Sequence, residues 1–269
     1  MKKIMKAITP IVVFALIVVG FASCAKKNNA TLILGTSADY PPYEFHAQID
    51  GKDTIVGFDV EIAKEIAKDL GKKLEIKDMD FDGLLAALVS GNVDIVVSGM
   101  TPTDERKQNV DFSDIYYQAE HGVLIRKASA EKYGTAMNSL RNEMMGAQRG
   151  AIQVGLAKTY IKGVSEEEAD APHPQVKELG KLPDLIMELK NSKIEAVVAE
   201  LPVAKAYLGA NQDLMLASYT IVDDTGGAAV AVKKGNTDLV VSINKTIARL
   251  LSEGKIDAFV TTATEMVEY

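Results

Sequence analysis

The sequence predicts an α/β protein of two lobes, each built on a mostly parallel β-sheet flanked by helices. From Ala30 onward, short runs rich in Val, Ile and Leu alternate with amphipathic segments, which is typical of strands and helices that alternate along a parallel sheet. The alternation occurs in two successive series, and this suits two lobes better than one. Two junctions, one on each side of the second series, predict a hinge made of two chain crossings.

The first series begins with the strand-like run Thr31 to Thr36. Apolar residues at helical spacing follow from Phe58 to Leu70, and Gly71 is a natural end for that helix. Next come a strand at Lys73 to Lys77 and a shorter helix at Phe81 to Ser90. The last two strands of this series are expected at Asp94 to Ser98 and at His121 to Arg126.

The second series contains segments of the same kinds and is followed by a last strand and helix that return to the first lobe. We therefore expect lobe 1 over 31–122 and 228–269, and lobe 2 over 123–227. The last strand is predicted at Ala228 to Lys233 and the last helix at Asp238 to Leu251. The segments of the second series are Met144 to Gln148, Gln153 to Ile161, Leu182 to Leu189, Ala196 to Ala199 and Pro202 to Leu208.

The amino-terminal segment ends at Cys24, the only cysteine of the chain. It opens with three lysines and continues through the apolar run Ile8 to Phe21, the order of an export signal. The run is shorter than a membrane-spanning helix requires. The segment resembles that of a bacterial lipoprotein, which predicts a signal peptide over 1–23, a lipid anchor on Cys24 and a tether over 24–30. An ordinary cleaved signal that leaves a free thiol is the alternative.

Composition is that of a folded domain outside the cytoplasm. The 269 residues are 47% apolar and 25% charged, with a formal net charge of −7. An acidic chain without a basic stripe is a poor binder of nucleic acid. With its single cysteine assigned to lipid, the chain has no disulfide framework. His46, His121 and His173 lack the spacing of metal ligands, so we expect neither a metal site nor a cofactor.

The most informative polar residues follow the predicted strand that begins at Asp94. Ser98, Gly99 and Thr101 supply hydroxyls and backbone groups at its end, and Arg106 follows within a short helical stretch. A guanidinium at this place can bind a carboxylate through two parallel hydrogen bonds, which a lysine cannot do. The alternative is a surface arginine paired with a neighbouring aspartate.

Several motifs in order resemble the periplasmic amino-acid-binding proteins of ABC importers, known as solute-binding family 3. The likeness extends from about residue 31 to the carboxyl terminus, and it implies the two-lobed periplasmic-binding-protein fold of type II. The motifs are Gly35 to Phe45 (GTSADYPPYEF), Gly57 to Ala63 (GFDVEIA), Phe81 to Leu88 (FDGLLAAL), the strand up to Arg106, and Val110 to Asp114 (VDFSD) with Tyr116 and Tyr117.

The resemblance also implies roles for individual residues. A ligand α-carboxylate would be held by Ser98, Thr101 and Arg106, beside the backbone of Gly99 and Met100. Glu200, after a second-lobe strand, matches the acid that meets the α-ammonium group. The second-lobe loop differs from the family pattern: Ile152 replaces a threonine before Gln153, so we expect backbone N–H groups at a helix start to act there. The aromatic walls of the site would be Tyr40 and Phe58, for which core packing is the alternative.

The side-chain preference of the site is open from the sequence. Asp39 and Glu44 could face the distal end of the ligand, and two acids there would favour a cationic side chain such as that of arginine, lysine or histidine. Simple surface solvation is the alternative for both. Gln148 and Arg149 lie near the second-lobe loop and could instead select glutamine or an acidic ligand.

These observations predict an extracytoplasmic binding protein that captures an L-amino acid between two lobes and delivers it to an ABC permease and its ATPase. We expect a monomer held at the membrane by its lipid. No GxSxG, HExxH or phosphate-binding glycine motif occurs in the sequence. The alternatives are an enzyme on the same scaffold, similar to cyclohexadienyl dehydratases, and a ligand-sensing domain.

Overall fold

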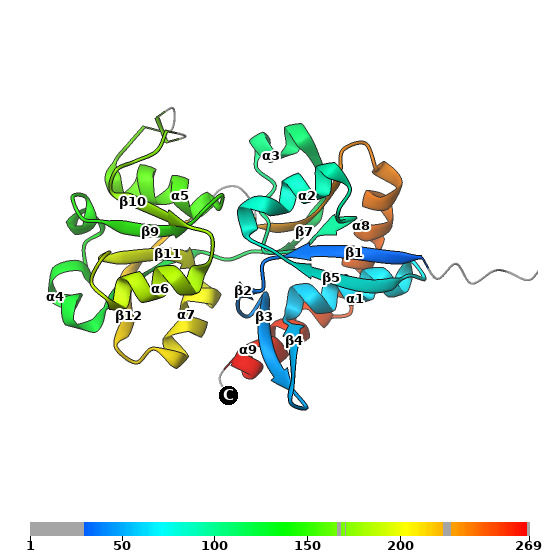
Figure 1. Ribbon diagram of the computed structural model, residues 1–269, viewed down its shortest axis with the longest axis horizontal. Coiled ribbons are helices and arrows are strands. Elements are labelled where there is room, and N and C mark those ends of the chain that lie inside the picture. Colours follow the sequence, from blue (N-terminus) through cyan, green and yellow to red (C-terminus); the bar gives the residue numbers. More distant parts are fainter. Residues whose placement is uncertain (1–29, 166–167, 170, 223–226, 268–269) are drawn as a thin grey trace, which may run out of the picture.

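The computed structural model describes residues 30–165, 168–169, 171–222 and 227–267. The predicted signal peptide and Cys24 lie outside the described residues, so both stay predictions. Within the described ranges, no helix combines the length and the hydrophobicity that crossing a membrane requires. Two lobes lie side by side along the long axis of the molecule, each with its own sheet (Figure 1).

The first lobe is built on a five-stranded sheet. In spatial order its strands are β5 (Lys73–Asp78), β1 (Thr31–Thr36), β6 (Ile95–Val96), β13 (Ala228–Lys233) and β7 (Val110–Tyr117). Strand β1 pairs in parallel with β5 and with β6. Strand β13, which returns from the second lobe, runs antiparallel to β6 and β7.

Helices cover both faces of this sheet. Helix α1 buries Phe58, Ile62, Ala63 and Ile66, which lie on one side of the helix because they fall at positions i, i+4, i+5 and i+8. A small antiparallel sheet of order β2-β3-β4 projects beside it. The elements are α1 (Phe58–Asp69), α2 (Leu84–Ser90), α3 (Asp104–Asn109), α8 (Thr237–Ser252), α9 (Lys255–Val267), β2 (Asp39–Tyr40), β3 (Glu44–Ile49) and β4 (Lys52–Val56).

The second lobe has a five-stranded sheet of its own. Its strands in spatial order are β10 (Val176–Leu179), β9 (Met145–Gln148), β11 (Ala196–Glu200), β8 (His121–Arg126) and β12 (Leu214–Ile221). The pairs of β9 with β10 and β11 are parallel, whereas β8 is antiparallel to β11 and β12. Its helices are α4 (Ala130–Tyr133), α5 (Ile152–Leu156), α6 (Leu182–Lys190) and α7 (Leu201–Ala210).

The chain passes between the lobes twice. The first crossing joins the end of β7 at Tyr117 to the start of β8 at His121, and the second joins β12 to β13. The whole of β8 pairs within the second sheet, so that sheet begins at His121, two residues before residue 123, where lobe 2 was expected to begin. Two crossings of this kind form the hinge that the sequence predicted.

Several elements differ from the sequence prediction. Strand β6 is two residues long because the segment up to Ser98 leaves the sheet early. The helix expected from Gln153 to Ile161 is α5 followed by a π-helical stretch, Ala157–Lys162. Helix α9 was not predicted, so Asp238 to Leu251 is not the last helix. The small sheet and the strands β7, β10 and β12 were not predicted either.

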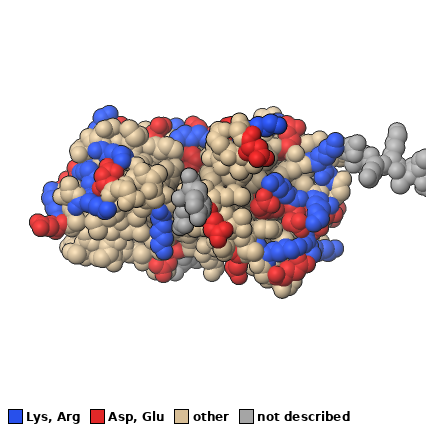
Figure 2. Space-filling view, turned by 90° about the horizontal axis from the view of Figure 1, so that it is seen from below, with Lys and Arg blue, Asp and Glu red and all other residues tan. Residues whose placement is uncertain are grey.

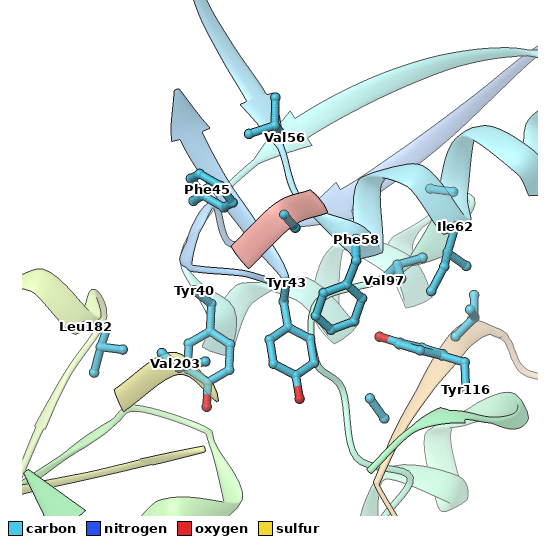
Figure 3. Close-up of a cluster of buried hydrophobic side chains, with 14 of the residues drawn as sticks. Tyr40, Tyr43, Phe45, Val56, Phe58, Ile62, Val97, Tyr116, Leu182 and Val203 are labelled. Carbon is cyan, nitrogen blue, oxygen red and sulfur yellow. The ribbon is translucent and has the colours of Figure 1, made fainter. Parts of the chain in front are cut away.

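The core of lobe 1 contains a packed group of aromatic rings near the cleft (Figure 3). The rings of Tyr43 and Phe58 lie 4.3 Å apart between centroids, and Tyr117 lies 5.1 Å from Phe58. Tyr43 and Phe58 have no exposed surface. Tilted rings at these distances stabilise the packing beyond the area that they bury.

Charged side chains of both signs occur on each lobe. On the face shown in Figure 2, Lys and Arg are interspersed with Asp and Glu over the two lobes. Many of these charges pair locally, as Lys64 does with Glu61 at 2.7 Å and Lys190 with Asp213 at 2.6 Å. Such exposed pairs each contribute little to stability.

Candidate ligand-binding site

A small cavity lies between the two lobes. It is formed where strands β1 and β6 of lobe 1 and strands β9 and β11 of lobe 2 end, which is where α/β sheets bind ligands. Its lining residues are Ser37, Tyr40, Glu44, Phe81, Ser98, Gly99, Thr101, Arg106, Gln148, Ala151, Ile152, Gln153 and Glu200.

Arg106 brings a guanidinium into this cavity. It stands on the first turn of α3, whose amino end is capped by Thr103: the Oγ1 atom accepts a hydrogen bond of 3.3 Å from the Arg106 N–H. Nη1 donates to the Thr101 carbonyl at 2.7 Å, and the guanidinium carbon lies 5.5 Å from the centre of the Phe81 ring. Burial lowers the pKa of Arg106 to about 10, so the group stays charged at neutral pH.

The same guanidinium also reaches the second lobe. Its Nη2 donates a hydrogen bond of 2.8 Å to the carbonyl of Gly150. These two carbonyl bonds hold the guanidinium plane in the cleft, which leaves the other N–H groups of Arg106 available to a carboxylate. The prediction that Arg106 belongs to the cleft therefore agrees with its position, and the surface alternative does not.

A buried acidic pair lies behind one end of the cavity. Ser98 donates its hydroxyl hydrogen to Oε1 of Glu44, and Asp59 accepts from the Gly99 N–H and from the Tyr116 hydroxyl, each at 2.8 Å. No N–H or O–H group of another described residue reaches Oε2 of Glu44 or Oδ1 of Asp59, and the two carboxyls form a hydrogen bond with each other in which Glu44 is the protonated partner. A cationic ligand group that replaced this proton would bring donors to both carboxylates.

Burial shifts the ionisation of both acids. Loss of solvation raises the pKa of Glu44 well above its usual value, and the neighbouring charge of Asp59 raises it further. Burial likewise raises the pKa of Asp59 to about 6, against the opposing effect of its hydrogen bond from Gly99. A cation placed beside these carboxyls would favour their ionised forms.

Glu200 faces the cavity from the second lobe. It is the last residue of β11, and its carboxylate accepts the hydroxyl hydrogen of Tyr43 from the first lobe. The Glu200 N–H donates to the hydroxyl of Tyr40 at 3.2 Å. Two tyrosines of lobe 1 therefore hold Glu200 in place when the lobes are in contact.

The second-lobe loop also contributes side chains. Gln148 Nε2 lies 3.1 Å from the Gly180 carbonyl and 3.3 Å from Asp39 Oδ2, and Gln153 Nε2 lies 3.2 Å from the Tyr40 hydroxyl. Ile152, where the family pattern has threonine, begins α5 at the cavity wall. Arg149 turns away from the cavity and pairs with Asp82 of lobe 1 at 3.5 Å.

Three of the predicted residues lie outside the cavity lining. Phe58 was expected as a wall, but it is fully buried against Tyr43 at the start of α1, so core packing describes its position. Met100 lies in the core, and its carbonyl accepts from Ala229 of β13. Asp39 was expected at the distal end of the ligand; its carboxylate instead accepts a hydrogen bond of 2.7 Å from the Leu182 N–H.

The cavity also contains residues that the sequence analysis missed. Phe81 is a second aromatic residue of the lining besides Tyr40, and Ser37 directly follows β1. Ala151 lines the second-lobe side. Ser37 and Phe81 follow the neighbouring strands β1 and β5, so the rule that ligands bind beyond the carboxyl ends of strands could have identified both.

Comparisons with known proteins agree with this geometry. The model of the bacterial extracellular solute-binding proteins, family 3, matches residues 32–263. The arginine-binding extracellular protein ArtP of Bacillus subtilis is 36% identical over 256 residues, covering 92% of this chain and 93% of the relative. A probable histidine-binding protein of Campylobacter jejuni is 33% identical over 240 residues, covering 89% and 87%.

Solved structures give the same result. The amino acid ABC transporter substrate-binding protein AbpA of Streptococcus pneumoniae, bound to L-arginine, superposes with a TM-score of 0.82 at 34% identity, covering 90% of this chain and 98% of that one. The predicted two-lobed fold of type II is thereby confirmed. The chain belongs to the bacterial extracellular solute-binding proteins, family 3.

Proposed function

We propose that this protein captures a cationic L-amino acid, with arginine as the first choice, and passes it to an ABC importer. The charges in the cavity are the observation that supports this most directly. Among the described lining residues, the acidic and basic side chains are Arg106, Glu44 and Glu200. A ligand cation beside Glu44 favours its ionised form, and one cation and two anions then complement a ligand with one carboxylate, one α-ammonium group and one cationic side chain.

Each ligand group then has a partner. The α-carboxylate binds Arg106, with the Thr101 hydroxyl beside it, and the α-ammonium group binds Glu200. The side chain extends between Tyr40 and Phe81 toward Glu44, where the donors of a guanidinium or ammonium group replace the proton that Glu44 and Asp59 share. Ser98 acts indirectly in this arrangement, since its hydroxyl donates to Glu44.

The known relatives support this ligand class. ArtP is named as an arginine-binding protein, and the AbpA structure contains L-arginine. An ancestral arginine-binding protein, 35% identical to this chain, has been solved with arginine and also with glutamine. Glutamine is therefore the alternative ligand, for which Gln148 and Gln153 offer amide groups.

Capture of the ligand follows from the division of the site between the two lobes. Lobe 1 comprises 31–122 and 228–269, and lobe 2 comprises 123–227. With the lobes apart, a ligand contacts only residues of lobe 1, among them Arg106, Thr101 and Glu44. Closure about the two crossings adds Glu200 and the loop before α5, so the ligand favours the closed form by the free energy of the added contacts. The closed lobes then present a shape that a permease can recognise.

The remaining parts of the proposal concern place and partners. The family is extracellular, and a lipid on Cys24 would keep the protein beside its permease and ATPase. Two acyl chains anchor a protein firmly, whereas one chain binds a membrane only marginally. We propose a monomeric transport protein and not an enzyme, because the related proteins are substrate-binding components of transporters.

A thermal panel tests the proposed ligand class. A ligand that binds only the folded state raises the melting temperature by mass action. We expect L-arginine, and to a lesser degree lysine and histidine, to raise the melting temperature of the purified protein, whereas glutamate does not. A response to glutamate alone, or to no common L-amino acid, would contradict the proposal.

A further inference from the structure

A line of contacts joins the two lobes beside the ligand cavity. On lobe 1 it contains the alternating acids Asp78, Asp80 and Asp82, which end β5 and follow it. On lobe 2 it contains two places where a glycine and a cationic residue are neighbours in the sequence: Arg149 with Gly150, and Gly180 with Lys181. Strands β9 and β10 pair in register up to Gln148 and Leu179, so both pairs leave the sheet at the same edge.

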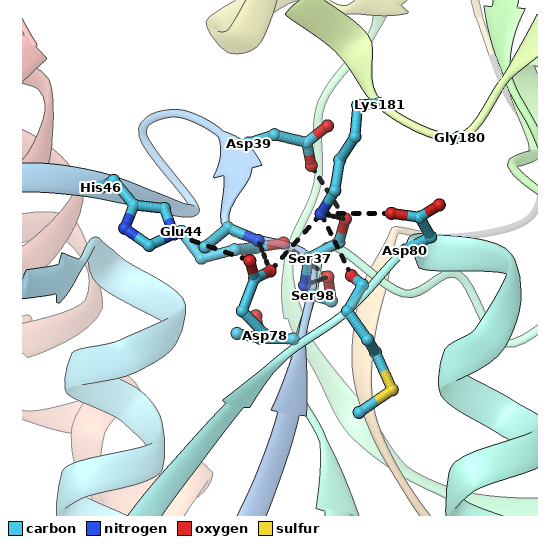
Figure 4. Close-up of polar contacts among 12 residues, drawn as sticks. Ser37, Asp39, Glu44, His46, Asp78, Asp80, Ser98, Gly180 and Lys181 are labelled. Carbon is cyan, nitrogen blue, oxygen red and sulfur yellow. Dashed lines mark hydrogen bonds and ion pairs between the residues drawn. The ribbon is translucent and has the colours of Figure 1, made fainter.

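Lys181 inserts its ammonium group among oxygen atoms of the other lobe (Figure 4). Its Nζ lies 3.3 Å from the Met79 carbonyl and 3.4 Å from the Ser37 hydroxyl. Carboxylate oxygens of Asp78 and Asp80 lie at 3.5 Å and 3.6 Å. The Lys181 side chain is 30% exposed, so the ion pairs are partly shielded from water.

The acceptor on lobe 1 is held in place by its own lobe. Asp78 Oδ1 accepts a hydrogen bond of 2.8 Å from the Ala38 N–H, and Asp78 Oδ2 lies 3.6 Å from His46 Nε2. The Asp78 carboxylate is therefore already oriented before the lobes meet. Because it needs no further ordering, little free energy is lost when Lys181 pairs with it.

The glycines permit the close approach of the lobes. A Cβ added to Gly180 would lie 2.6 Å from Asp80 Oδ2, and one added to Gly150 would lie 3.0 Å from Asp82 Cβ. Gly180 does not have a positive φ, so its lack of a side chain is needed for space and not for backbone conformation. Gly150 directly follows Arg149, which pairs with Asp82. Gly180 directly precedes Lys181, which pairs with Asp80.

We infer that Lys181 is a positioning residue that sets ligand affinity from outside the cavity, by pairing with Asp78 and Asp80 when the lobes close. None of these three residues lines the cavity. The ion pairs join different lobes, so they stabilise the closed form alone and reduce the rate at which it reopens. This inference rests on the proposed capture of a ligand between the lobes.

Replacing Lys181 tests the inference. In Lys181→Met, dissociation of L-arginine should accelerate by roughly two- to fivefold with little change in the association rate, because the lost pairs are largely surface ion pairs. Lysine and histidine should dissociate faster by the same factor, since Lys181 touches no part of a ligand. The matched control is Lys193→Met, which removes a lysine paired with Glu188 at 3.0 Å within lobe 2 and should change neither rate.

A steric variant provides a second, independent measurement. In Gly180→Ala the new methyl group displaces the Asp80 carboxylate from Lys181. The double variant Gly180→Ala with Lys181→Met should therefore bind L-arginine no more weakly than whichever single variant binds it less tightly. Gly209→Ala, where no atom lies within 4 Å of the added Cβ, is the control. Additive losses would show that the two changes act separately and would overturn the inference.

The failure of this inference is distinguishable from failure of the proposed function. Small-angle scattering of Lys181→Met without added amino acid should give a larger radius of gyration than the unsubstituted protein, whatever the ligand is. Unchanged scattering together with unchanged dissociation rates would refute the role of Lys181 and leave amino-acid capture intact. A loss confined to one ligand would make Lys181 a specificity residue and would equally refute it.

Discussion

The carboxylate of Asp39, in lobe 1, accepts a hydrogen bond of 2.7 Å from the backbone N–H of Leu182, the first residue of α6 in lobe 2. The first N–H groups of a helix have no partner within the helix, and α6 has no side-chain cap of its own. A helix of one lobe is therefore capped by an acid of the other. Burial raises the pKa of Asp39, against the opposing effect of this backbone bond.

Asp39→Ala should weaken the binding of every ligand by a similar factor, because the cap exists only while the lobes are in contact. The loss of a helix cap costs about 1 kcal/mol, or roughly fivefold in Kd. Titration calorimetry with arginine, lysine and histidine would measure it. Asp213→Ala, which removes an acid paired with Lys190 inside lobe 2, is the control; a loss restricted to one ligand would place Asp39 in direct contact with that ligand.

Arg106→Ala should abolish most of the affinity, because it leaves the ligand carboxylate buried without its charged donor. The expected loss is about 2–3 kcal/mol, or roughly 30- to 150-fold in Kd. Arg106→Lys should recover only part of it, since an ammonium cannot form the two parallel bonds of a guanidinium. Calorimetric affinities check both. Arg249→Ala removes a partly exposed arginine, far from the cavity lining, that pairs with Glu65 and Asp69 and should leave Kd unchanged; equal effects of the two alanine variants would remove Arg106 from the site.

Glu44→Gln should shift the preference of the site from arginine toward glutamine. The amide keeps the shape of the carboxyl but loses the charge that attracts a guanidinium, which should reduce the ratio of the two affinities by roughly tenfold or more. Competition between labelled arginine and unlabelled glutamine measures the ratio directly. Glu61→Gln, at an exposed acid on α1, is the matched control. An unchanged ratio in Glu44→Gln would mean that another residue selects the side chain.

The pH dependence of stability should reveal the acidic pair. Burial raises the pKa of Glu44, and it raises that of Asp59 to about 6, so the folded protein retains protons that the unfolded chain has released. Stability from this pair is present at acid pH and is lost as pH rises through about 6. The free energy of unfolding of Glu44→Gln, minus that of the unsubstituted protein, should therefore increase between about pH 4 and pH 7. Urea unfolding at several pH values gives this difference; a flat difference would show that the two carboxyls ionise independently of folding.

Cys24→Ser should release the protein from membranes. The hydroxyl cannot replace the thiol that accepts the diacylglycerol, so the anchor predicted from the sequence would be absent. Fractionation of cells into soluble and membrane parts measures the change. Membrane association that persists in the variant would point to an anchor elsewhere.

The local pattern of the sequence determined much of the architecture. The strand at Thr31–Thr36 and the helix that begins at Phe58 were predictable because a two-residue or 3.6-residue period of apolar side chains depends only on neighbours along the chain. The arginine of the site was predictable for a related reason: Ser98, Thr101 and Arg106 follow a single strand end and lie close together in any fold that contains it.

Only the tertiary structure decided which residues face the cavity and which join the lobes. Phe58 and Phe81 are both aromatic residues at the start of a helical segment, yet Phe58 packs behind Tyr43 and Phe81 lines the cavity. Asp39 was expected to face the ligand and Lys181 was given no role, because their partners lie more than a hundred residues away in the sequence. Such contacts depend on how the two lobes, each with its own sheet, approach each other across the hinge. The spacing of apolar residues along the chain carries no information about that approach.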